Sequence, residues 1–299
     1  MEKLKLKVKE KIRDSFSAIE ERHMGYENQF NQELMVGLPV IIRMDGNNFS
    51  TFTKDLKEPY DERLSELMIK TCEYAVKKTN AVCGFVGSDE ITLALNAEDY
   101  IKTQIYFGGK VRKIDSVLAG KVSTYFSGML DVYLPEKAEK LDKAIKNGED
   151  LDYPSFDCKV WNVPNLQEGA NAFYLRENSV FKNAISMACQ GNNLFSDKEV
   201  HGVNGRDKQE MLFKKGINFN DYPVHFKRGV YVQRRKKVKE GFDYTPEELA
   251  LLPEMHHART NPDKVSQITE IRQIDMPIFS KIINQEGVIF GGEEPLIKT

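Results

Sequence analysis

The sequence predicts an α+β fold: a ferredoxin-like antiparallel sheet with helices on one face, followed by a helical or mixed C-terminal portion. Two observations support this prediction. Short apolar runs alternate with long stripes of helical spacing, and they come in the order strand, helix, hairpin, helix, strand. That order is the split βαβ arrangement, in which the first strand and the hairpin strands lie together at the centre of the sheet.

The first half of this pattern begins with the run LPVIIRM at 38–44, which is rich in β-branched residues and ends in the turn signal DGNN. It predicts a buried strand followed by a tight loop. Over 60–78, apolar residues recur at helical spacing and two acids lie in the first turn, so a helix is expected there.

The second half begins with two apolar runs, 81–86 and 91–95, that flank the tetrapeptide GSDE. They predict a hairpin with an acidic tip. Apolar spacing predicts a second long helix over 111–126, and a last strand is expected around 156–163. The charged start, MEKLKLKVKEKIRD, predicts an amphipathic helix rather than a signal peptide.

Composition narrows the classes of function. The chain has no run of about eighteen apolar residues, and its four cysteines are scattered singly with no histidine at a metal-ligand spacing. We therefore expect a cytoplasmic protein without a membrane partner or structural zinc. The formal net charge is −2, so nucleic acid would need a local basic patch. The segment HFKRGVYVQRRKKVKE at 225–240, expected at a hairpin edge or in a loop, is a candidate patch, although most basic runs are solvated faces.

Acidic residues follow two of the expected central strands. Asp45 ends the first strand and Asp89 lies at the tip of the hairpin, so the predicted topology can bring both to one edge. Convergent carboxylates repel unless a cation lies between them, and hard oxygen ligands with few protein contacts suit Mg²⁺ carrying phosphate and water. The Gly46 carbonyl is a third candidate ligand. The basic residues Lys110 and Lys113, at the start of the second long helix, are expected to meet phosphate charge.

Each acidic motif taken alone is also typical of an ordinary turn. A hydrophobic strand before each motif and a single helix between them favour metal-dependent phosphoryl chemistry. From the residues alone, an ordinary pair of turns and a magnesium site both stay open.

Four stretches, in this order and spacing, resemble the tRNA-histidine guanylyltransferase family: IIRMDGNNFSTFTK, GFVGSDEITLAL, KVSTYFSGML and PSFDCKVWNVP. The longer segment that starts FKNAISMACQGNN and ends GVYV resembles the bacterial and phage guanylyltransferase-like branch. The resemblance covers about residues 43–232. It implies a catalytic domain similar to the palm of DNA polymerases, and nucleotide addition in the 3′ to 5′ direction at the 5′ end of tRNA.

The resemblance also implies roles for particular residues. Asp45 and Asp89 become the catalytic carboxylates and, with the Gly46 carbonyl, the ligands of two Mg²⁺ ions. GTP, ATP and other nucleoside triphosphates are the implied substrates. The implied nucleotide contacts are Asp45, Gly46, Asn47, Asn48, Phe49, Ser50, Lys57, Ser88, Asp89, Lys110 and Lys113. The family places a lysine directly before a proline-containing turn, and here Lys57 is displaced by one residue.

Contacts to RNA are expected in the second half of the chain. The candidates are Arg176, Lys182, Asn183, Lys198, His201, Lys208, Arg234 and Arg235. Trp161, the only tryptophan, is expected in the strand core rather than as a platform for a base, and Phe156 and Phe173 are expected in the core as well. A provisional boundary near residue 165 divides a palm-like catalytic domain (1–165) from a C-terminal portion for tRNA binding and oligomerisation (166–299).

One departure from the family pattern bears on the reaction. Where enzymes that add the extra guanylate to tRNA-histidine usually have a HINNLYN-like segment, residues 181–187 read FKNAISM, without the histidine. This favours templated repair of a tRNA with an incomplete 5′ end over addition of a single guanylate at position −1. A palm-fold nucleotide cyclase and a noncatalytic RNA-binding module are the alternatives from other classes. The resemblance also implies a homotetramer.

Overall fold

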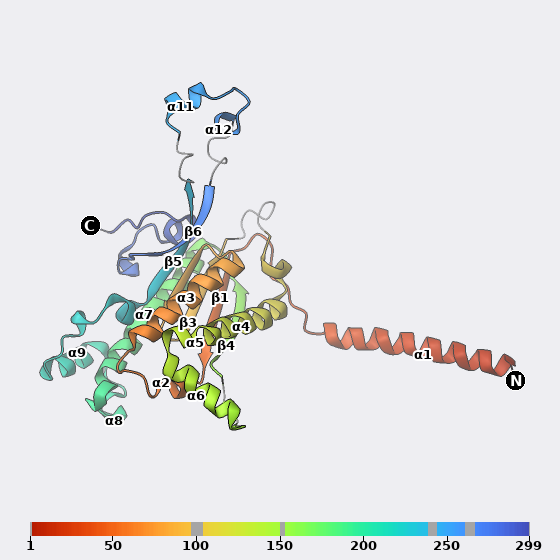
Figure 1. The fold of residues 1–299 in the computed structure, drawn as a ribbon, viewed down its shortest axis with the longest axis horizontal. Helices are drawn as coiled ribbons and strands as arrows, with labels where there is room; N and C mark the ends of the chain where they lie inside the picture. Colours follow the sequence, from red (N-terminus) through yellow and green to blue (C-terminus); the bar gives the residue numbers. More distant parts are fainter. Residues whose placement is uncertain (1, 97–103, 150–152, 239–243, 261–266, 299) are drawn as a thin grey trace.

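The computed structural model describes residues 2–96, 104–149, 153–238, 244–260 and 267–298 (Figure 1). Six antiparallel strands form one sheet in the order β4-β1-β3-β2-β5-β6. Their bounds are β1 (Val40–Asn47), β2 (Cys83–Gly87), β3 (Glu90–Leu95), β4 (Ser155–Asn162), β5 (Val230–Val238) and β6 (Gln267–Ile274). The order of the first four strands is the ferredoxin-like one, so the predicted fold class is confirmed.

Two long helices, α3 (Glu62–Thr79) and α4 (Val111–Gly128), cover one face of the sheet, in front of it in Figure 1. They pack on the residues of β1 that point to this side, Val40, Ile42 and Met44, which are fully buried. The Asp61 carboxylate caps the first turn of α3 by accepting a hydrogen bond from the Arg63 backbone N–H, so the helix starts directly after it.

The opposite face is covered by α7 (Leu166–Gln190), a helix that the sequence prediction did not place. Its residue Phe173 lies in a second apolar cluster with Ile41, Phe85 and Tyr231. Phe173 and Phe156 are both buried, as expected. Trp161 is 38% exposed, so its expected place in the strand core is wrong. The reason is that β4 is the edge strand of the sheet, whereas α7 packs on β1, β2 and β3.

Shorter elements surround this framework. The remaining α-helices are α1 (Glu2–Asn28), α2 (Phe49–Thr53), α5 (Leu130–Tyr133), α6 (Pro135–Lys146), α8 (Asp197–Val200), α9 (Gly205–Lys214), α10 (Val224–Arg228), α11 (Pro246–Leu251) and α12 (His257–Thr260). Short 3₁₀ turns span Tyr106–Gly109, Gly191–Asn193, Phe219–Asp221 and Phe279–Lys281, and a π-helical turn spans Gly287–Gly291. Helix α1 projects away from the body (Figure 1).

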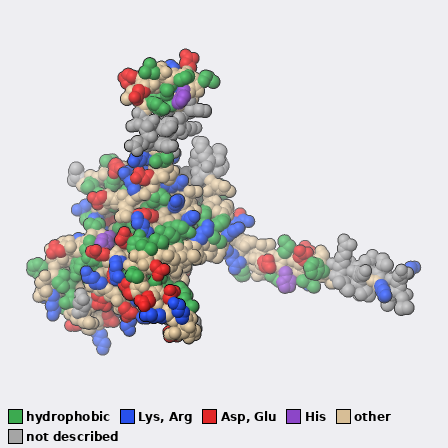
Figure 2. Space-filling view, viewed as in Figure 1, with side chains coloured by type: hydrophobic (Ala, Val, Ile, Leu, Met, Phe, Trp, Pro, Cys, Tyr) green, Lys and Arg blue, Asp and Glu red, His purple; other side chains and the backbone are tan. Residues whose placement is uncertain are grey.

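The basic run at 225–240 forms most of α10 and all of β5, and its last residues lie outside the described part of the chain. Strand β5 pairs with β6 over Tyr231–Val238 but with β2 only over Val230–Gln233, so the cations at 234–237 lie on the β5–β6 hairpin beyond the β2 pairing. Strands on both sides of residue 165 share one sheet, and the division into two domains stays a prediction. Basic and acidic side chains are interspersed over the face of the molecule in Figure 2. Within the described ranges, no helix has the length and apolar character needed to cross a membrane.

Candidate active site

The structure brings the two predicted carboxylate positions together at one end of the sheet. Asp45 pairs with Glu90 in the register of β1 and β3, and the Gly46 backbone N–H donates a hydrogen bond to the Asp89 carbonyl at 3.1 Å. The pKa of Asp89 is raised, first by burial and further by the negative charge of Asp45. The two acids therefore share one electrostatic environment although they are far apart in the chain.

Asp45 and Gly46 lie near the end of β1, and Asp89 lies in the turn between β2 and β3. A Cβ on Gly46 would lie 2.4 Å from Cδ2 of Phe49, so the backbone at this point needs glycine. Asn48 and Ser88 both have positive φ, which lets each strand end abruptly beside its acid. Phe49, an expected nucleotide contact, is 3% exposed, and its ring packs on Phe126 and Phe156 in the core.

Glu90 was not singled out from the sequence, yet it joins this end of the sheet to α7. Its Oε2 lies 3.1 Å from Nη1 of Arg176 and 3.9 Å from Nε of Arg43. Burial raises the pKa of Glu90, and the Arg176 charge opposes that shift. Arg176, an expected RNA contact, is therefore ion-paired. The nearby Arg43 Nε and Asp157 Oδ1 are both buried without a hydrogen-bond partner among the described residues.

A cavity of about 500 Å³ opens beside Asp89, between the hairpin tip, the loop that follows α2, α7 and α10. Four predicted polar contacts line it: Ser50, Lys57, Ser88 and Asn183. Asp89 lies in the same wall, while Asn47 and Asn48 are exposed on the neighbouring turn. Three further lining residues, Lys54, Tyr60 and His225, were missed. Lys54 precedes Lys57 by one turn and was accessible to sequence reasoning, whereas His225 arrives from a distant helix.

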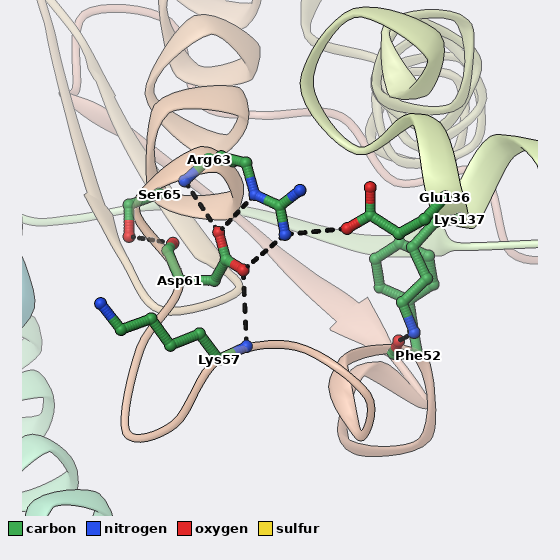
Figure 3. Close-up of polar contacts among 7 residues, drawn as sticks. All are labelled: Phe52, Lys57, Asp61, Arg63, Ser65, Glu136 and Lys137. Atoms are coloured by element: carbon green, nitrogen blue, oxygen red, sulfur yellow. Dashed lines mark hydrogen bonds and ion pairs between the residues drawn. The ribbon is translucent and has the colours of Figure 1, made fainter.

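The loop that holds the two lysines is tied down by Asp61 (Figure 3). Its carboxylate accepts hydrogen bonds from the Arg63 side chain at 2.9 and 3.1 Å and from the Lys57 backbone N–H at 3.4 Å. Arg63 also bridges to Glu136 at 2.8 Å. The Arg63 hydrogen bond holds the pKa of Asp61 below its ordinary value. This wall of the cavity is thereby fixed in position before any ligand binds.

Lys110 and Lys113 lie at the opposite end of the sheet from Asp45 and Asp89 of the same chain. Their expected position beside these carboxylates is therefore wrong. Helix α4 starts near the end of β3 and runs back along the sheet toward the carboxylates. Its Ser123 hydroxyl accepts a hydrogen bond from the Phe156 backbone N–H near the start of β4. At about 1.5 Å per residue, the two lysines are roughly 15–20 Å from that point. They line a separate cavity of about 840 Å³ with Arg234.

The other expected RNA contacts are spread over several surfaces. Lys182, Lys198 and His201 are exposed on α7 and α8 and just after α8. Lys208 donates a hydrogen bond to the Ser186 hydroxyl of α7. Arg234 and Arg235 point to opposite faces of β5: one donates to the Asn80 carbonyl, and the other pairs with Glu294 of the C-terminal segment. None of these roles is tested by the structure.

The donor set at Asp45 and Asp89 suits a hard cation. Two carboxylates and a backbone carbonyl leave room for phosphate and water oxygens, which is the coordination that Mg²⁺ prefers beside a nucleotide. Burial and the neighbouring Asp45 charge raise the pKa of Asp89, and a bound cation would oppose that shift. In the part of the chain that the structure describes, no group of three or more His, Cys, Asp or Glu side chains is arranged to hold a metal ion by itself.

Comparison with known proteins agrees with this geometry. Residues 20–164 match the family model described as tRNAHis guanylyltransferase. A solved bacterial tRNA(His) guanylyltransferase-like protein in complex with ATP is 32% identical, with a TM-score of 0.63 over 73% of this chain and 87% of that one. The chain belongs to the tRNAHis guanylyltransferase family. The resemblance inferred from the sequence is confirmed, and the chain is therefore a nucleotidyltransferase.

Two further members place it within this family. A bacterial guanylyltransferase-like protein in complex with GTP is 26% identical, with a TM-score of 0.62 over 88% of this chain and 94% of that one. The tRNA(His) guanylyltransferase of Saccharomyces cerevisiae is 26% identical over 231 residues, which are 72% of this chain and 91% of the yeast protein. Both similarities extend beyond the residues matched by the family model.

Proposed function

We propose that this family member repairs tRNA by adding nucleotides, in the 3′ to 5′ direction and according to a template, to an incomplete 5′ end. The observation that supports this most directly is the hydrogen bond between Gly46 and Asp89, which places Asp45 of β1 beside the turn that carries Asp89, and Asp89 lines a cavity of about 500 Å³. Family membership supplies the reaction class, nucleotidyl transfer to the 5′ end of tRNA.

In this proposal, Asp45, Asp89 and the Gly46 carbonyl would hold two Mg²⁺ ions. When bound, the ions lower the pKa of the attacking hydroxyl and stabilise charge on the leaving phosphate oxygens. The chain itself contributes position: the Gly46–Asp89 hydrogen bond holds the two acids in register, and the Arg176–Glu90 pair ties α7 to the same end of the sheet.

The proposed chemistry is an in-line displacement at phosphorus. The 3′-hydroxyl oxygen of the incoming nucleotide forms a bond to the α-phosphorus at the activated 5′ end. The bond to pyrophosphate breaks, or to AMP if the end is adenylated, and the hydroxyl proton passes to solvent. GTP, ATP and other nucleoside triphosphates are the proposed substrates, since bacterial relatives have been solved with ATP and with GTP.

The polar lining of the main cavity suits a triphosphate. Ser50 and Ser88 supply hydroxyl groups, and Lys54 and Lys57 supply cations that can move to phosphate oxygens. Asn183 lines the opposite wall from α7. The proposed triphosphate contacts at Lys110 and Lys113 would need a nucleotide held elsewhere than at this chain's own carboxylates.

Templated repair is preferred over addition of a single guanylate because residues 181–187 lack the histidine of the HINNLYN-like segment. Watson–Crick pairing would then select each nucleotide. A nucleotide cyclase stays as the alternative that needs no RNA, and incubation with GTP alone would reveal its cyclic product. Assembly as a homotetramer and a cytoplasmic location belong to the same proposal.

The decisive experiment is a radiolabelled extension assay on a tRNA shortened at its 5′ end, with each nucleoside triphosphate supplied in turn. We expect addition of whichever nucleotide complements the opposing base, and pyrophosphate release. Addition of guanylate irrespective of the template would favour the tRNA-histidine role. Asp45→Ala and Asp89→Ala should abolish extension, whereas Asp142→Ala, which removes an exposed acid of α6, should not. Full activity of either site variant with Mg²⁺ would remove the proposed site.

A further inference from the structure

The edge strand β4 has two faces of opposite character. The face toward α4 carries Phe156 and Val160, which are buried. The other face carries Asp157, Lys159 and Trp161, of which the last two are exposed. The indole is 38% exposed, which is unusual for a side chain that is buried to a high degree in most proteins. This face of β4 therefore presents a partly exposed aromatic ring with a cation beside it.

The exposed face of β4 leads directly to the carboxylates. Asp157 pairs with Asp45, and Trp161 pairs with Ile41, in the register of β4 and β1. Because these residues alternate along the strand, they lie on the same side of the sheet as Asp45. Trp161 lies four residue steps along the strand from Asp157, which is about 13 Å. A ligand that reaches from the carboxylates along β4 meets Lys159 first and the indole next.

On this side of β4, Lys159 and Trp161 stay open to solvent. Helix α7 packs on the three neighbouring strands, and α4 packs on the other side of β4. The next residue, Asn162, donates hydrogen bonds from its side-chain amide to the backbone carbonyls of Met35 and Leu38. These bonds involve Asn162 and do not account for the exposed indole of Trp161. An exposed aromatic ring with a neighbouring cation is the combination that binds unpaired nucleotides: the ring stacks on a base, and the cation meets the backbone phosphate.

We propose that Trp161 is a stacking platform for an unpaired base at the acceptor end of the RNA, with Lys159 beside the adjoining phosphate. The inference rests on the proposed function for the identity of the partner. It adds a binding position about 13 Å from the reacting groups, which would hold the RNA end in place while nucleotides are added. Trp161 is accordingly a positioning residue rather than a catalytic one.

The chain offers its own reporter, because Trp161 is the only tryptophan. Intrinsic fluorescence excited at the indole band thus reports this position alone. Titration of the wild-type protein with a 5′-shortened tRNA should quench the emission in a saturable way. The same tRNA trimmed of its single-stranded nucleotides at the acceptor end should quench much less. Equal quenching by the trimmed RNA, or none by either, would overturn the proposal.

Substitution tests the energetic contribution. Trp161→Ala should weaken RNA binding by about 5- to 150-fold, the range observed for loss of one base–aromatic stack, whereas Trp161→Phe should retain most of the affinity. The matched control is Tyr26→Ala, since Tyr26 is 59% exposed on the projecting helix α1. Unchanged RNA affinity in Trp161→Ala would overturn the platform while leaving the proposed reaction, tested at Asp45, intact.

A second copy of the chain is the competing occupant, because β4 is an open sheet edge. If a copy covers the indole, the emission should change on dilution of the protein and stay unchanged on addition of RNA. That pattern would also overturn the proposal. Retained extension activity in Trp161→Phe, with a raised KM for tRNA and unaltered kcat in Trp161→Ala, is the kinetic result expected of a positioning residue.

Discussion

The two faces of the central sheet are built from the same strands but carry different chemistry. On β1, Val40, Ile42 and Met44 point to the side of α3 and α4 and are fully buried in hydrocarbon. The alternate positions begin with Ile41, in the α7 core, and continue with half-buried Arg43 and Asp45. The side chains on one face of β1 thus stabilise the fold, and the proposed reactive acid, Asp45, lies at the end of the other face. Neighbouring residues can therefore separate the two contributions.

The largest effect is expected from Asp45→Asn. It keeps the size of the side chain but removes the charge that would hold Mg²⁺, so kcat for extension should fall by at least about 10²- to 10³-fold, the scale of losing one preorganised electrostatic group. The midpoint of denaturant unfolding should change little, because Asp45 is only half-buried. Loss of folding in this variant would contradict the division between the two faces.

The adjacent substitution Met44→Ala should do the reverse. It removes a fully buried side chain from the α3/α4 core and should lower the free energy of unfolding by about 2–5 kcal/mol. Denaturation followed by circular dichroism measures the loss. At a temperature where the variant is still folded, its kcat should stay within a few-fold of wild type. A larger drop in kcat than in Asp45→Asn would show that the buried face also sets the catalytic geometry.

Much of this contrast was predictable from the sequence, and the parts that were not have a common cause. Period-two and helical spacing located the strands at 38–44 and 81–95 and the helices at 60–78 and 111–126, because each segment buries one face. The convergence of Asp45 with Asp89 followed from strand order. The direction in which a helix runs and the elements that pack beside a strand were harder to predict. Lys110 was placed at the wrong end because proximity in sequence to the hairpin says nothing about where the following helix begins.

The same limit explains the error at Trp161. Its strand was correctly located, but whether a strand residue is covered depends on which strand lies at the sheet edge and on where α7 packs. Neither is encoded in the local pattern. The cavity beside Asp89 also needed the fold, since its walls come from the loop at 54–61, α7 and α10.

A smaller effect is expected from Gly46→Ala, next to Asp45 near the end of β1. The new Cβ would overlap the Phe49 ring, which is itself packed against Phe126, so the ring or the turn must shift. Overpacking of this kind costs about 1–3 kcal/mol. Extension activity should fall as well, because the shift moves the proposed ligand carbonyl. In Gly120→Ala, the matched control on α4, the added methyl group meets open space and should stabilise the helix by up to about 1 kcal/mol. Equal stability of both variants would contradict the close packing at Gly46.

The smallest expected effect is a change in pH dependence at Glu177, the buried acid on the α7 face. Its carboxylate accepts hydrogen bonds from the Tyr231 hydroxyl and the Phe279 backbone N–H, both at 3.0 Å. Burial nevertheless raises its pKa. The folded state therefore holds this proton more tightly than the unfolded state, whose glutamate has a pKa of about 4.3. Its contribution to stability is fully present below that value and is lost as the pH rises through the folded pKa.

Glu177→Gln should flatten this part of the stability curve. The amide oxygen can accept from the Phe279 backbone N–H and the amide NH2 can donate to the Tyr231 hydroxyl, but the side chain cannot ionise. The loss in free energy of unfolding between about pH 4 and pH 7 should therefore be smaller than in wild type. Urea unfolding at several pH values, compared with Glu66→Gln at an exposed position of α3, measures the difference. The comparison isolates Glu177 from Asp89 and Glu90, whose raised pKa values add the same sign of slope to both proteins. If the curves of Glu177→Gln and wild type stay parallel, Glu177 holds its proton equally in the folded and unfolded states, which would contradict the rise of its pKa by burial.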